Sequence, residues 1–140
     1  MTNQEKKAYL QQYRAADDEI NDLLREKERI MSRLTRMTSC LSGMPHGGGE
    51  SDKMTDGVAK VIELDAEIDR KVDALCDFRS EVCTNIETVG DANLRRVLML
   101  RYISGKTWEQ IAVEMERTYQ WVCILHGRAL NKFSVALDSN

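Results

Sequence analysis

Apolar positions near the end of the chain have the spacing of short helices that share one core. Between residues 94 and 130 they recur three or four positions apart, the period of a helix with one buried face. The pattern predicts a helix, a turn containing Gly105, a short helix, a tight turn and a final helix. The apolar positions are Leu94, Val97, Leu98, Leu100, Tyr102, Ile103, Ile111, Ala112, Met115, Val122, Leu125, Ala129 and Leu130. Two short helices that cross steeply after a turn of about three residues make a helix-turn-helix, whose second helix can enter a DNA major groove.

The first two-thirds of the chain shows a different period. Apolar positions alternate steps of four and three, a 3.5-residue repeat that makes a seam requiring a partner helix. One seam contains Tyr9, Tyr13, Ala16, Ile20, Leu23, Lys27, Ile30, Leu34, Met37 and Leu41, and the other contains Ile68, Val72, Leu75, Arg79, Val82, Ile86 and Val89.

Proline and glycine residues separate the two seams and require a turn. Residues 43–49 contain Pro45 and four glycines, which do not continue a helix. We therefore predict an antiparallel, coiled-coil-like helical hairpin over residues 1–90, with a Gly-rich turn at 42–52 and a second helix that Ser51 or Asp52 caps and that starts near Lys53. A homodimeric coiled coil through the same helices is the alternative.

Two charged residues lie on or beside these apolar seams. Lys27 interrupts the first seam, and Asp65 falls near the second. In a hairpin that turns near residues 46–47 the two side chains lie opposite each other, so we expect them to pair and to fix the register.

Composition supports an all-α chain. Aromatic residues make up 6% of the sequence and there is one proline, whereas charged residues make up 31%, as suits solvated helices. No apolar run approaches ~18 residues and the N-terminus is polar, so we expect no membrane segment, no signal peptide and a cytoplasmic location. The four cysteines form no C-x-x-C pair, which favours reduced thiols over a zinc site.

The net charge of −3 is unevenly distributed. Residues 51–90 hold five basic and ten acidic residues, whereas residues 91–140 hold seven basic and five acidic ones, a net of +2. Since phosphate neutralisation supplies much of DNA affinity, this small excess predicts weak non-specific binding, which a dimer or a helper protein would strengthen.

The last third of the chain resembles region four of bacterial sigma factors. The segments GKTWEQIAVEM, RTYQWV and LHGRAL carry the resemblance. The matching residues are Thr107, Trp108, Glu109, Ile111, Ala112, Met115, Thr118, Val122, Leu125, Ala129 and Leu130. The segments LSGMPHGGGESDKM and TDGVAKVIELDAEID extend the resemblance to small phage and prophage transcriptional regulators of Gram-positive bacteria that carry this C-terminal module. The resemblance implies a helix-turn-helix DNA-binding domain at residues 91–140 that binds double-stranded DNA and acts with host RNA polymerase.

Individual roles follow for the predicted DNA surface. We expect Thr107 and Thr118 to cap the two helices of the motif. If Val122, Leu125 and Ala129 face inward, then Tyr119, Gln120 and Cys123 face outward, and Gln120 can read adenine edges while Tyr119 contacts a phosphate or a thymine methyl. Arg117, Arg128 and Lys132 are the expected phosphate contacts, and the resemblance implies that Lys106 and Trp108 also meet the DNA backbone. Trp121 and Ile124 have an alternative role in packing against the hairpin or a partner.

We expect no enzyme activity, no cofactor and no catalytic or metal site. The two histidines, His46 and His126, lie in no Ser/His/Asp or Cys/His set, and His46 beside Cys40 or Asp52 is weak evidence for a metal. The Gly-rich loop lacks the G-K-[ST] sequence of a nucleotide site. Two further classes of function stay open: a DNA-packaging subunit like a small terminase, and a protein-interaction module that has lost DNA binding, such as an inhibitor of a host factor.

Overall fold

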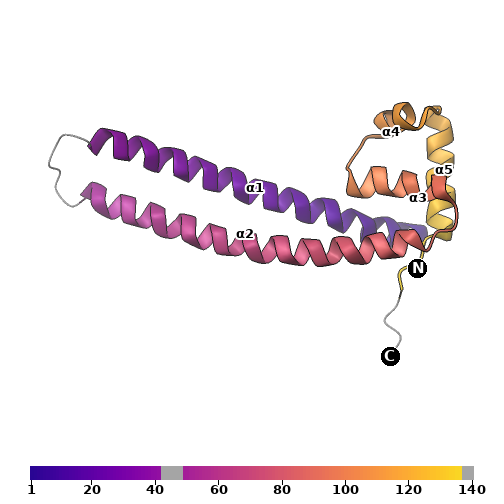
Figure 1. The fold of residues 1–140 in the computed structure, drawn as a ribbon, viewed down its shortest axis with the longest axis horizontal. Coiled ribbons are helices and arrows are strands. Elements are labelled where there is room, and N and C mark those ends of the chain that lie inside the picture. Colours follow the sequence, from indigo (N-terminus) through magenta and orange to yellow (C-terminus); the bar gives the residue numbers. More distant parts are fainter. Residues whose placement is uncertain (42–48, 137–140) are drawn as a thin grey trace. The chain divides into compact units, whose positions relative to one another are not determined.

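The computed structural model describes residues 1–41 and 49–136, and all regular elements in those ranges are helical. The predicted all-α class is therefore confirmed. In chain order the elements are α1 (Asn3–Leu41), α2 (Gly49–Glu87), α3 (Ala92–Leu98), the π-helix η1 (Met99–Ile103), α4 (Trp108–Met115) and α5 (Tyr119–Lys132). Figure 1 labels the five α-helices. None of the helices in the described ranges has the length and apolar character needed to cross a membrane.

Helix α2 begins earlier than the sequence pattern indicated. We predicted a turn through residue 52 and a helix starting near Lys53, but α2 starts at Gly49 and already contains Ser51 and Asp52. Asp52 suits the start of a helix, because the free N–H groups there carry partial positive charge. Residues 42–48 lie outside the described residues, as do the predictions made for the rest of the turn and for His46.

The chain divides into two compact units. One of them consists of Asp17–Ala74 and is called the middle unit below. In this unit, side chains of α1 contact side chains of α2. Lys71 Nζ lies 2.6 Å from Glu19 Oε1, and the predicted pair forms, with Lys27 Nζ 2.5 Å from Asp65 Oδ1. Further along, a Cβ on Gly57 would lie 2.6 Å from Leu34 Cδ2, so this glycine lets the helices approach closely. Residues later in α1 therefore lie beside residues earlier in α2, so the two helices are antiparallel in this unit.

The inward face of α2 differs from the prediction at two positions. Val72 is 38% exposed and Arg79 is exposed, whereas Lys71 and Phe78 are half-buried. A 3.5-residue repeat permits a step of three or of four at each turn, and here the step of three follows Ile68. Lys71 can occupy the inward position because its aliphatic stem covers the seam while its ammonium group reaches Glu19.

The second unit, the composite unit, joins Met1–Ala16 to the chain from Leu75 onward. Its main core combines both long helices with the short ones and consists of Leu10, Val82, Ile86, Val89, Leu94, Val97, Leu98, Tyr102, Ile103, Leu125, Ala129, Leu130 and Phe133. Polar contacts tie α1 to the rest, since Lys6 Nζ donates to the Leu130 carbonyl at 2.8 Å and Asn85 Nδ2 donates to the Tyr9 hydroxyl at 2.9 Å. This division cuts across the boundary we placed at residue 90, because the first turns of α1 share a core with α3 and α5.

The π-helix η1 lets adjacent residues serve two cores. Leu100 packs with Ile111, Ala112 and Val122 in a small second cluster, whereas Tyr102 and Ile103 belong to the main core. The π-helix, whose turn is wider than that of an α-helix, ends where the Ser104 N–H donates to the Met99 carbonyl at 3.0 Å. Gly105 follows with a φ of 70°, a conformation that favours glycine, and so forms the predicted turn.

Candidate nucleic-acid interface

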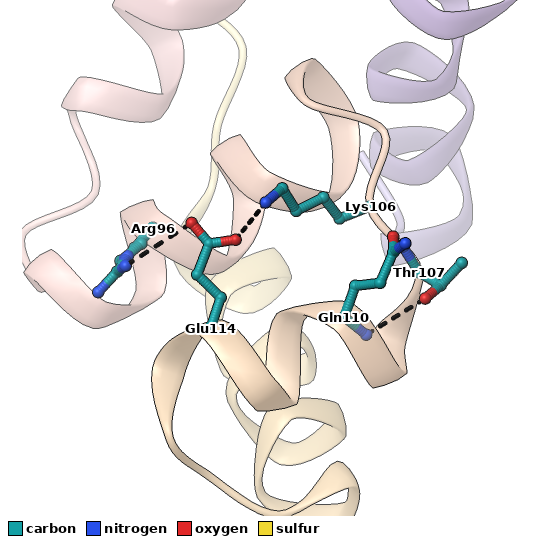
Figure 2. Close-up of polar contacts among 5 residues, drawn as sticks. All are labelled: Arg96, Lys106, Thr107, Gln110 and Glu114. Carbon is teal, nitrogen blue, oxygen red and sulfur yellow. Dashed lines mark hydrogen bonds and ion pairs between the residues drawn. The ribbon is translucent and has the colours of Figure 1, made fainter.

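Helix α4 starts with a complete capping box at the predicted threonine. Thr107 Oγ1 accepts a hydrogen bond from Gln110 N–H at 3.2 Å, and Gln110 Oε1 accepts one from Thr107 N–H at 2.9 Å (Figure 2). The cap predicted at Thr107 is confirmed. The reciprocal contact from Gln110 was missed, although Thr-x-x-Gln is the sequence signature of this box.

A three-residue turn connects α4 to α5. Glu116 has a φ of 55°, in the left-handed region, and Arg117 N–H returns to the Ala112 carbonyl at 2.9 Å, which closes the end of α4. Thr118 then caps α5, as predicted, because its Oγ1 accepts from Trp121 N–H at 3.1 Å. Both helices of the motif therefore have fixed first turns.

The two faces of α5 are those predicted. Val122, Leu125 and Ala129 are at most 6% exposed. The side chains of Tyr119, Gln120, Cys123, Arg128 and Lys132 are exposed, as is Arg117 just before the helix. Because α5 buries one side in the core, the opposite side is available to a ligand.

An exposed tryptophan lies between two arginines on this surface. The Arg117 guanidinium carbon lies 5.9 Å from the centre of the Trp121 ring, and that of Arg128 lies 6.0 Å from it. Trp121 is 40% exposed and Ile124 is 48% exposed. Since a cation within about 6 Å of an indole face is attracted to it, Trp121 helps to hold both guanidinium groups at the surface of α5.

Tyr119 and Cys123 are neighbours on the same face, one turn apart. Interaction with the Cys123 thiol, more than burial, raises the pKa of the Tyr119 hydroxyl. A phenol is already neutral at physiological pH, and the raised pKa extends this neutral range, so the hydroxyl can donate a hydrogen bond.

Lys106 and Trp108 are both engaged within the protein. Lys106 forms an ion pair with Glu114, which also lies 3.9 Å from the Arg96 Nη2 (Figure 2). The hydrogen bond from Lys106 is the main cause that lowers the pKa of the Glu114 carboxyl. Trp108 is half-buried, with its ring centre 4.6 Å from that of His126 and the Arg101 guanidinium 4.2 Å above it. A phosphate at Lys106 would compete with Glu114.

His126 is a core residue, for which the sequence suggested no role. It is 7% exposed, and its Nε2 is hydrogen-bonded to the Tyr102 hydroxyl at 2.7 Å. Burial first, and then the positive charges of Lys7 and Arg101, lower the pKa of His126 to about 4. Its position four residues from both Val122 and Leu130 was the available signal, because residues four apart share a helix face.

The described residues contain no group of three or more His, Cys, Asp or Glu side chains placed to hold a metal ion. Comparison with protein-family models, curated proteins and solved structures gives no match for this chain.

Proposed function

We propose that this chain is a DNA-binding transcriptional regulator whose helix α5 enters the major groove. The observation that carries the proposal is the outer surface of α5, where Gln120 and other polar side chains are exposed and two guanidinium groups lie near the ring of Trp121. A buried core beneath and a threonine cap at the start fix the helix that presents them. Because the backbone of the helix is already ordered, binding to DNA would cost only the ordering of its exposed side chains.

The residues divide into reading and positioning groups. Gln120 has the amide that can pair with both polar atoms on the major-groove edge of adenine. Arg117, Arg128 and Lys132 contact phosphates, which sets the register of the helix without conveying sequence. The free N–H groups in the first turn of α4 provide a further phosphate contact beside Thr107.

We also propose that the regulator acts at promoters together with host RNA polymerase, in keeping with its resemblance to sigma region four and to small phage regulators. The exposed side of α4 is available for such a contact, since Val113 is 79% exposed and Glu109 is exposed beside it.

A homodimer would double the number of DNA contacts. Val58 and Ile62 support self-association, because they lie one turn apart on α2 and are 46% and 64% exposed. Ile62→Glu should convert the dimer to a monomer in a measurement of mass in solution, and an unchanged mass would exclude this surface.

The second candidate is a protein-interaction module, which the exposed apolar side chains favour. Trp121 and Ile124 lie on α5 and Val113 on α4, and each is at least 40% exposed. Aromatic residues are enriched in the cores of protein interfaces, so the same surface would fit a protein groove.

Binding to DNA duplexes chosen from a random pool distinguishes the two candidates. Gln120→Ala should weaken binding to the chosen duplex by about 1–3 kcal/mol while leaving random duplexes unaffected. Arg128→Gln should weaken binding to both and lower the slope of log affinity against log salt by about 1. Gln11→Ala and Arg70→Gln, which change exposed side chains elsewhere, are the matched controls. If no duplex is enriched, or if all four variants bind alike, α5 does not read DNA.

A further inference from the structure

The outer face of α1 carries a row of arginines within the middle unit. Arg25, Arg29, Arg33 and Arg36 follow one another at steps of four, four and three, so they share one side of the helix. All four side chains are exposed. Together they are called the arginine row below.

Positive charge exceeds negative charge in the hollow that the arginine row lines, with four arginines against Asp22 and Glu28. Arg25 Nη1 lies 3.1 Å from Asp22 Oδ1, but in the described part of the chain no carboxylate forms an ion pair with Arg29, Arg33 or Arg36. The sequence has no Asp or Glu from residue 29 to residue 41. Like charges four residues apart on a helix repel each other, so the row is unfavourable for the isolated helix and favours an anionic ligand.

The hollow that all four arginines line is polar, whereas a second hollow beside Arg33 also contains the apolar side chains of Ile30, Leu34 and Met37. The side chains that line one shallow hollow with the four arginines are Asp22, Glu28 and Ser32, and none of them is apolar. Protein interfaces are built around an apolar centre, whereas protein surfaces that bind nucleic acid are polar and strongly positive. The composition of the hollow that the four arginines share therefore favours a nucleic acid over a protein.

The chemistry and spacing of the row suit a backbone with regularly repeated charge. All four residues are arginines, whose planar fork can donate two parallel hydrogen bonds to one phosphate. From Arg25 to Arg36 the row extends about 16 Å along the helix axis, at ~1.5 Å per residue. We propose that the arginine row binds the phosphate backbone of a nucleic acid, independently of base sequence.

This second surface would supply affinity that residues 91–140, with a net charge of +2, lack. The inference does not require α5 to read bases, because the row lies in the other compact unit and has its own ligand chemistry. The two proposals can therefore fail separately.

The test compares two double variants of the full chain that remove equal charge. One is Arg29→Gln/Arg36→Gln, and the control is Arg70→Gln/Arg79→Gln on exposed positions of α2. Fluorescence anisotropy measures affinity for a labelled DNA duplex of arbitrary sequence across a salt series. Each phosphate contact contributes about 0.9 to the slope of log affinity against log salt, so the row variant should lower the slope by about 2 and the control should leave it nearly unchanged. Circular dichroism checks that both variants stay helical.

Several results would overturn the proposal. These are a wild-type chain that binds no duplex even at low salt, equal slopes for wild type and row variant, and equal losses in the row and control variants. If the row variant instead changes only the mass of the chain in solution, the row holds carboxylates of a second copy. Repeating the comparison in a Gln120→Ala chain separates the two surfaces, because the change in slope should persist there whether or not Gln120 reads a base.

Discussion

Protonation of His126 should destabilise the fold as the pH falls from about 6.5 to about 4, since burial lowers the folded-state pKa of this side chain from 6.5 to about 4. Above this window the imidazole is neutral in both the folded and the unfolded chain. Within it the unfolded chain takes up a proton that the folded core excludes, so the free energy of unfolding decreases as the solution becomes more acidic. Below pH ~4 both states are protonated and the loss reaches its limit.

The expected size follows from the shift in pKa. One unit corresponds to ~1.4 kcal/mol, so the contribution of His126 should decrease by about 2 kcal/mol between pH ~7 and pH ~4.5. The hydrogen-bond partner of Nε2 is the Tyr102 hydroxyl at 2.7 Å. This hydroxyl is neutral, so it does not offset the cost of charging the ring as a carboxylate would.

The assay is urea unfolding at several pH values in a His46→Gln background, in which His126 is the remaining histidine. His126→Gln is the comparison, because glutamine can still hydrogen-bond Tyr102 but does not titrate. The difference between the two chains isolates His126 from the carboxylates that also titrate near pH ~4.5. Parallel loss of stability in both chains across the window would refute the reasoning.

Three further predictions concern stability and are checked by the same unfolding measurement. Thr107→Ala should cost about 1 kcal/mol, because it removes the acceptor that caps α4; a change below ~0.3 kcal/mol would contradict the capping role. Glu116→Gly should add up to about 1 kcal/mol by relieving the left-handed backbone, and a loss would show that the glutamate side chain contributes to the fold. A double-mutant cycle with Lys27→Leu and Asp65→Asn should give a coupling of about 0.5 kcal/mol, since both side chains are partly exposed; Lys27→Leu alone should be less stable than the parent, and a more stable variant would argue against the pair.

Features set by short-range chemistry could be predicted from the sequence. Thr107 and Thr118 cap their helices as expected because a threonine before an apolar period has one strongly favoured local role. The inward positions of α5 follow from the period of Val122, Leu125 and Ala129. Lys27 and Asp65 also pair as predicted, since the turn and the 3.5-residue repeat together determine the register.

Features that depend on packing between distant segments could not be predicted from the sequence. The repeat allowed either Lys71 or Val72 to face inward, and the contact between Lys71 and Glu19 settled the choice. The burial of His126 depends on Tyr102 and Trp108, which approach from other helices. Lys106 was predicted as a phosphate contact, and no local rule in the sequence indicated its pairing with Glu114 or the further approach of Arg96.

The central claim is that the outer face of α5 contacts DNA, and the cysteines of the chain provide a direct test. Cys123 is free and exposed on α5, and Cys76 is free and exposed on α2. The rate at which each thiol is alkylated, measured by mass spectrometry with and without bound duplex, reports whether DNA covers it. Bound duplex should slow alkylation of Cys123 while leaving Cys76 unchanged. Equal rates at Cys123 with and without duplex, under conditions where the chain is saturated with DNA, would contradict the claim.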